Sequence, residues 1–175
     1  MLKPRFISLV FMIFAAAFGR LVPHPWNFSP LGAIALFGGA YFADKRLAVF
    51  VPLLAVFLSD VVLGFYPAFL FVYLGYVFVT FVGMRMIEIK SPLRIVSASL
   101  CGSVVFFLWT NFISWGFGPL YAKDFGGLIR SYIAGIPFFQ HTLCGDFLFT
   151  VILFGTFTVI EKRFPSLKEE PVAVG

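Results

Sequence analysis

The sequence predicts an all-α integral membrane protein built as a bundle of six transmembrane helices. The first observation is the placement of charge: residues 47–84 contain one charged side chain, Asp60, and residues 95–122 contain none. The second is composition, because 61% of the residues are hydrophobic and 12% are charged, about half the charged fraction of a soluble domain. A helix needs about 20 apolar residues to cross the hydrocarbon core of a bilayer, and both runs can supply them.

The expected spans follow one another closely. We place them at residues 5–20, 30–43, 47–64, 68–87, 95–116 and 137–160, in a single transmembrane domain of residues 1–163 followed by a polar tail of residues 164–175. The second span is short for a bilayer, and Pro23, Pro25 and Pro30 exclude a continuous helix before it. Residues 21–29 are therefore expected to form a loop or a re-entrant stretch. Residues 117–135 are expected to form a surface loop with at most a short interfacial helix.

The N-terminal segment has two interpretations. Its basic start at Lys3 and Arg5, the apolar run 6–14 and the alanines at 15–17 also fit a cleavable signal peptide. Because the apolar run continues through residues 15–19 without a polar break, we favour an uncleaved first span.

Basic residues indicate the orientation in the membrane. Counted over alternate connections, ten Lys and Arg residues fall on the side of the N-terminus and three fall on the other side. The ten are Lys3, Arg5, Lys45, Arg46, Arg85, Lys90, Arg94, Lys162, Arg163 and Lys168, and the three are Arg20, Lys123 and Arg130. The positive-inside rule then predicts a multi-pass protein of the cytoplasmic membrane with both termini in the cytoplasm.

Polar and aromatic side chains gather at the opposite, outer ends of the spans. A small-molecule pocket has apolar walls and a few directed polar groups, and polar groups inside a membrane commonly mark function. We therefore predict a substrate-binding site formed by His24, Trp26, Asn27, Asp60, Asn111, Trp115, Gln140, His141 and Asp146.

Structural roles compete with this interpretation. Trp115 also fits an interfacial aromatic belt, and Asn111 also fits a hydrogen bond between helices. A buried carboxylate needs a partner, so Asp60 or Asp146 could instead form an internal pair with Arg20.

Other chemistry finds little support in the sequence. There is no phosphate-binding glycine loop, no H-E-x-x-H zinc motif and no G-x-S-x-G elbow, so we expect neither an enzyme nor a bound cofactor. The basic residues flank the spans and do not form a nucleic-acid-binding patch. Cys101 and Cys144 are expected to pack as small apolar groups, and a metal site at His141 and Cys144 is a minor alternative.

Small residues offer another choice between packing and docking. Ala15 and Gly19 are spaced by four residues, which allows another helix to approach closely. The partner could be a helix of this chain or a separate membrane subunit, and Gly38, Gly39 and Gly64 allow the same two interpretations.

Three stretches carry a family resemblance. Residues 20–40 (RLVPHPWNFSPLGAIALFGGA), residues 51–64 and residues 136–146 resemble an uncharacterised bacterial family assigned to transport, and the likeness covers residues 20–160. That family resembles in turn the substrate-binding S components of energy-coupling factor transporters. S components are six-helix proteins that capture vitamins or metal ions at the outer face, where the first outer loop helps to close the site.

The resemblance implies a role in uptake and a set of partners. Small residues in the first helix of S components dock a transmembrane coupling subunit that works with two ATPases, and Ala15 and Gly19 match that pattern with Gly in place of the second Ala. We therefore expect a subunit that binds a small water-soluble, vitamin-like nutrient. A stand-alone facilitator or proton-coupled carrier using Asp60 and Asp146, and a non-transporting membrane scaffold, are the alternatives.

Overall fold

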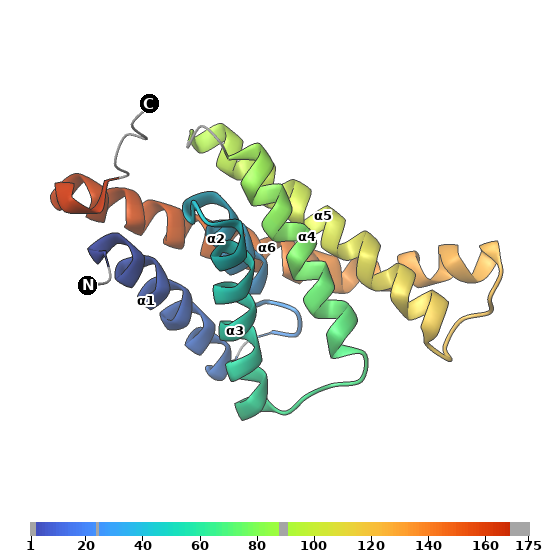
Figure 1. Cartoon of the computed structure of the whole chain (residues 1–175). Coiled ribbons are helices and arrows are strands. Elements are labelled where there is room, and N and C mark those ends of the chain that lie inside the picture. Colours follow the sequence, from blue (N-terminus) through green and yellow to red (C-terminus); the bar gives the residue numbers. More distant parts are fainter. Residues whose placement is uncertain (1–2, 24, 88–90, 169–175) are drawn as a thin grey trace.

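The computed structural model describes residues 3–23, 25–87 and 91–168. Its six α-helices are α1 (Pro4–Phe18), α2 (Leu31–Tyr41), α3 (Lys45–Leu63), α4 (Phe69–Met86), α5 (Pro92–Phe117) and α6 (Phe125–Arg163). Two 3-10 turns, η1 (Gly19–Leu21) and η2 (Pro165–Leu167), follow α1 and α6 (Figure 1). No strand occurs in the described residues, so the prediction of an all-α fold is confirmed.

Helix length and composition identify a multi-pass membrane protein. Five segments are long and apolar enough to cross a bilayer, namely α1 with η1, α3, α4, α5 and α6. The exception is α2, which has 11 residues and is therefore only about 16 Å long. It spans about half of a hydrocarbon core of about 30 Å.

The short helix α2 lies at the centre of the bundle. Nine of its eleven residues are buried, and it packs against α3, α4 and α6. A Cβ atom added to Gly38 would collide with Pro52 of α3, and one added to Gly39 would collide with the backbone of Thr80 in α4. Both glycines therefore serve internal packing, because only their missing side chains let the neighbouring helices approach this closely.

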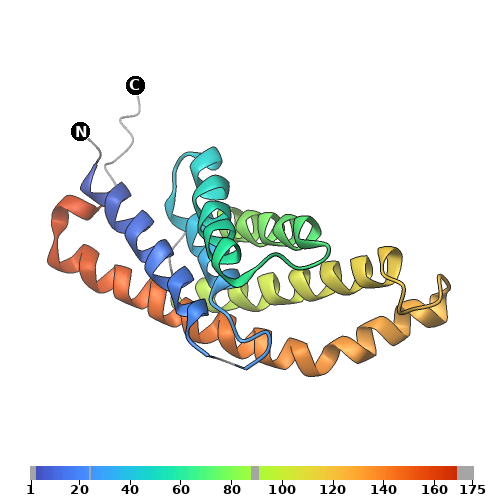
Figure 2. The same cartoon turned by 90° about the horizontal axis from the view of Figure 1, so that it is seen from below.

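The last helix corrects the sequence prediction. We expected a loop over residues 117–135 and a helix from residue 137, but α6 begins at Phe125 and runs for 39 residues past Pro137. The Asp124 side chain caps the helix by accepting a hydrogen bond from the Gly127 backbone at 2.6 Å. Gly127, Ser131 and Gly135 are buried and share one face of the helix, which lies along α5 (Figure 2). Mutual packing and a cap thus override a Gly-rich, polar composition.

The start of α1 and the end of α6 meet at one end of the bundle. Arg5 Nη1 lies 2.5 Å from Glu161 Oε1 and donates to the Leu167 carbonyl oxygen at 2.5 Å. The Leu167 side chain is buried. Residues 164–168 of the predicted polar tail therefore fold back against α1, and residues 169–175 lie outside the described residues.

Candidate functional site

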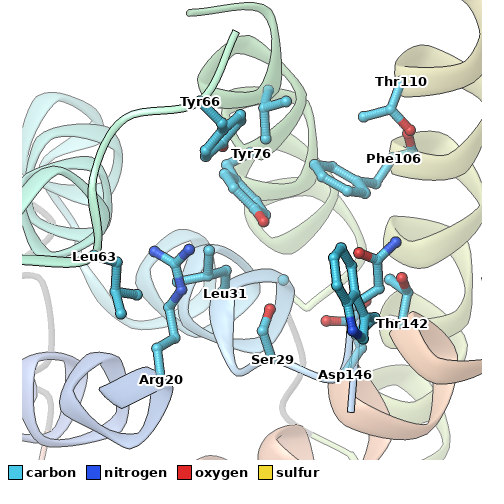
Figure 3. A pocket seen from close by; sticks show the side chains of 14 residues that line it. Arg20, Ser29, Leu31, Leu63, Tyr66, Tyr76, Phe106, Thr110, Thr142 and Asp146 are labelled. Atoms are coloured by element: carbon cyan, nitrogen blue, oxygen red, sulfur yellow. The ribbon is translucent and has the colours of Figure 1, made fainter. Parts of the chain in front are cut away.

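A cavity of about 590 Å³ lies near the end of the bundle where α1 ends and α2 begins. It is lined by residues from the end of α1 to the middle of α6 (Figure 3), namely Arg20, Trp26, Asn27, Ser29, Leu31, Gly32, Leu63, Tyr66, Val72, Tyr76, Phe106, Thr110, Thr142 and Asp146. Trp26, Asn27 and Ser29, from the connection before α2, contribute part of the wall.

The first turn of α2 lies at this cavity, and a residue of another helix caps it. The residue before α2, Pro30, makes no side-chain cap. Instead the Asp146 carboxylate of α6 accepts hydrogen bonds from the backbone N–H groups of Gly32 and Ala33. Free N–H groups and the helix dipole both favour a negative charge at this position, so Asp146 stabilises the buried start of α2.

Asp146 has a third donor and packs closely against the start of α2. Ser103 Oγ of α5 donates to Asp146 Oδ2 at 2.6 Å, and the residue is 5% exposed. A Cβ atom added to Gly32 would collide with the carboxylate. Glycine at position 32 is therefore what allows Asp146 to approach the backbone of α2.

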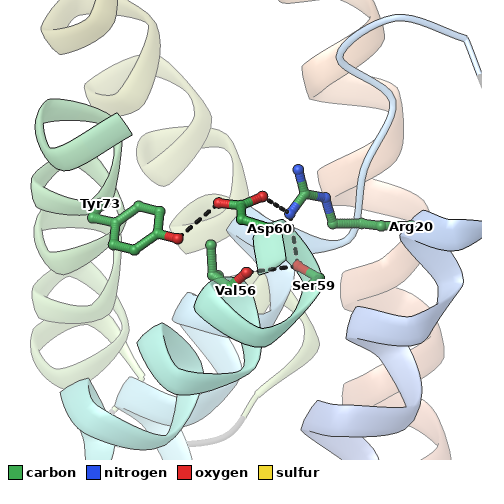
Figure 4. A network of polar contacts seen from close by, with 5 residues as sticks. All are labelled: Arg20, Val56, Ser59, Asp60 and Tyr73. Carbon is green, nitrogen blue, oxygen red and sulfur yellow. Dashed lines mark hydrogen bonds and ion pairs between the residues drawn. The ribbon is translucent and has the colours of Figure 1, made fainter. Parts of the chain in front are cut away.

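The second buried carboxylate, Asp60, belongs to an ion-pair network beside the cavity (Figure 4). Arg20 Nη1 lies 2.7 Å from Asp60 Oδ1 and donates to Ser59 Oγ at 2.7 Å. The Tyr73 hydroxyl donates to Asp60 Oδ2 at 2.7 Å. Asp60 is fully buried and does not itself line the cavity, so its contribution there is to hold the Arg20 guanidinium in place.

Aromatic side chains form the wall across from the start of α2. The rings of Tyr76 and Phe106 are stacked, with centroids 4.7 Å apart and planes inclined by 19°. Tyr66 lies in the connection between α3 and α4, where burial above all, with the nearby Asp60 charge, raises its pKa to about 12. Its hydroxyl therefore keeps its proton at neutral pH and can donate a hydrogen bond into the cavity.

The structure brings only some of the predicted site residues together. Trp26, Asn27 and Asp146 line the main cavity. Asn111 lines a smaller adjacent cavity of about 180 Å³, which Asn27 also lines. Its side-chain amide donates to the Phe107 carbonyl oxygen at 2.9 Å.

Three other predicted residues lie away from the described cavities. Trp115 Nε1 donates to the Ala122 carbonyl oxygen at 2.9 Å and stabilises the α5–α6 connection, while Gln140 and His141 are exposed. Gln140 and His141 precede Asp146 by six and five residues, which places them about 240° and 140° around the helix from it. The remaining predicted residue, His24, lies outside the described residues.

Sequence reasoning missed several residues that do line the cavity. Thr142 precedes Asp146 by one helical turn, so the spacing of four residues would have found it. Arg20 was considered only as an ion-pair partner, although it reaches the cavity. Tyr66, Tyr76 and Phe106 lie among 35 aromatic residues, and no local signal separates them from the others.

The described residues contain no group of three or more His, Cys, Asp and Glu side chains that could hold a metal ion. Cys144 is exposed and Cys101 is partly buried.

The residues predicted to dock a partner lie at the surface of α1. Ala15 is exposed and borders an open apolar groove between α1 and α6. A Cβ atom added to Gly19 would meet nothing within 4 Å. Unlike Gly38 and Gly39, Gly19 makes no close contact with another helix among the described residues.

Residues 1–167 match a protein family described as a family of unknown function, DUF6580, and the chain belongs to that family. No curated protein and no solved structure matches the chain.

Proposed function

We propose that this chain is a membrane-embedded binding subunit for the uptake of a small water-soluble nutrient. The observation that carries the proposal is the cavity of about 590 Å³ at the start of α2. Cavities of about 300–1,000 Å³ with apolar walls and a few convergent polar groups are typical of small-molecule sites. Here the walls are largely aromatic and aliphatic, and Arg20, Tyr66, Asn27 and Asp146 supply the polar groups.

The proposed orientation places this cavity on the outer side of the cell membrane. The alternation of the helices assigns most of the described basic residues to the other end of the bundle. They lie at the start of α1, between α2 and α3, near the end of α4 and the start of α5, and at the end of α6. By the positive-inside rule that end faces the cytoplasm. In this arrangement α2 and residues 22–30 together make the second of six spans, and both termini are cytoplasmic.

The proposed energy source is a coupling subunit with partner ATPases. The exposed surface around Ala15 and Gly19 is the proposed docking position, because a flat row of small side chains lets a second helix approach closely. A stand-alone proton-coupled carrier would need Asp60 or Asp146 to exchange protons freely. Each carboxylate is instead held by several hydrogen bonds within the bundle, which favours the binding role.

A cavity-filling variant tests the binding role. Thr110 lines the cavity and Leu108, two residues earlier on α5, is 48% exposed. We expect Thr110→Trp to abolish the retention of small molecules by the protein in native mass spectrometry. The matched control Leu108→Trp should retain them as the wild type does.

Three results would contradict parts of this proposal. Retention of the same small molecules by Thr110→Trp would place the site elsewhere. No retained molecule in the wild type would favour a scaffold. Uptake by the purified chain alone in liposomes without ATP would favour a stand-alone carrier.

A further inference from the structure

Only part of the Arg20 guanidinium is bonded to described protein atoms. Its Nη1 atom is used by Ser59 and Asp60, while Nε and Nη2 donate to no protein atom in the part of the chain that the structure describes. The Arg20 side chain is 14% exposed, and Figure 3 shows its guanidinium reaching into the cavity. Because Asp60 and Ser59 fix one edge of the planar group, the other edge is oriented in advance, the geometry that binds a carboxylate or phosphate best.

Asp146 lines the same cavity at a different position from Arg20. Its carboxylate can accept more hydrogen bonds than the described donors supply. A carboxylate accepts about four hydrogen bonds, and the donors present are Ser103 Oγ and the backbone N–H groups of Gly32 and Ala33. These donors are neutral, so among the described residues no side-chain cation faces Asp146 as Arg20 faces Asp60. An ammonium or another cationic donor on a ligand would complete this site.

The two groups enter from separated positions with an aromatic surface facing them. Arg20 comes from the end of α1 and Asp146 from α6, and the stacked rings of Tyr76 and Phe106 lie across from them (Figure 3). Aromatic faces attract both cations and flat rings. The cavity thus has one end suited to an anion, one end suited to a cation, and an aromatic wall across from them.

Charge balance selects among ligand types. A ligand with only acidic groups would bring a further acidic group toward the Asp146 carboxylate, and two carboxyl groups in a poorly solvated site resist being ionised together. A ligand with only basic groups would leave the Nε and Nη2 donors of Arg20 without an acceptor, which is costly once water is excluded. A ligand with both kinds of group satisfies each end and adds no net charge.

We propose, building on the binding role above, that the ligand is a small zwitterion whose acidic group binds Arg20 and whose basic group binds at Asp146. Tyr76 and Phe106 then contact the portion of the ligand that joins the two groups.

The first experiment exposes the purified wild-type protein, in detergent, to the total water-soluble metabolite extract of the cells that express it. Native mass spectrometry followed by fragmentation then identifies the retained molecules. We expect them to carry both an acidic and a basic group. Retained molecules that are only acidic, only basic or neutral would overturn this inference and leave the binding role intact, whereas no retained molecule would overturn both.

The second experiment modifies the ligand, so the folding of the protein is not at issue. The retained molecule is compared with its amide, which lacks the acidic charge, and with its N-acetyl derivative, which lacks the basic charge. Each should bind about ten- to a hundredfold more weakly, the effect of one charged hydrogen bond. Equal binding by either derivative would contradict the inference.

A variant links the acidic group to Arg20. In Arg20→Gln the free acid should lose its advantage over the amide, because the cation that favours it is gone and the unpaired Asp60 charge repels it. A preference for the free acid that persists in folded Arg20→Gln would place the acidic group elsewhere and overturn the assignment.

Discussion

The two buried carboxylates of this protein, Asp60 and Asp146, are stabilised by different kinds of partner. Asp60 faces the full positive charge of Arg20, whereas Asp146 faces neutral donors, the Ser103 hydroxyl and the first N–H groups of α2. The first arrangement joins α1 to α3 and orients a cation beside the cavity. The second joins α2, α5 and α6 and leaves a carboxylate at the cavity with only neutral donors among the described residues. One buried acid is thus an ion-pair partner and the other a helix cap, so we expect unequal effects on stability when each is neutralised.

Neutralising Asp60 should have the largest effect. Asp60→Asn keeps the size of the side chain but leaves the Arg20 charge without a partner, and breaking a buried ion pair costs about 3–5 kcal/mol. We expect that loss in the free energy of unfolding, measured by denaturant titration in mixed micelles. The double variant Arg20→Gln with Asp60→Asn should recover most of it, and failure to recover would show that the pair is not the source of the loss.

Adding a methyl group at Gly32 should have an intermediate effect. Gly32→Ala would push the Asp146 carboxylate away from the start of α2 and cost about 2 kcal/mol through lost hydrogen bonds and strain. Thermal unfolding in the same micelles would measure it. The matched control is Gly19→Ala, where the added atom meets nothing and stability should not change. If Gly32→Ala were equally stable, the carboxylate would not be needed as the cap.

Neutralising Asp146 should have the smallest effect of the three. The amide oxygen in Asp146→Asn can still accept from Gly32 and Ala33, so we expect a loss of about 1 kcal/mol, measured by the same titration. A loss as large as that of Asp60→Asn would mean that Asp146 has a charged partner, and would remove the distinction between the two carboxylates.

Much of the fold could be predicted from the sequence, because a membrane helix is recognised by a long run of apolar residues. The first five predicted spans agree with helices α1 to α5 to within a few residues. The start of α6 could not be found this way, since Gly127, Ser131 and Gly135 favour a loop until α5 lies against them. Which side of a helix faces inward was also missed, so Gln140 and His141 were grouped with Asp146 although they lie on other faces of α6.

The sequence by itself determined that this chain is helical, belongs in a membrane and has polar side chains near one set of predicted helix ends. Those properties depend on hydrophobicity and charge within short windows. Only the tertiary structure decided that Arg20 meets Asp60 forty residues away and that Ser103 meets Asp146 forty-three residues away. Such pairs depend on how the helices pack, and a buried polar group takes whichever partner that packing places beside it.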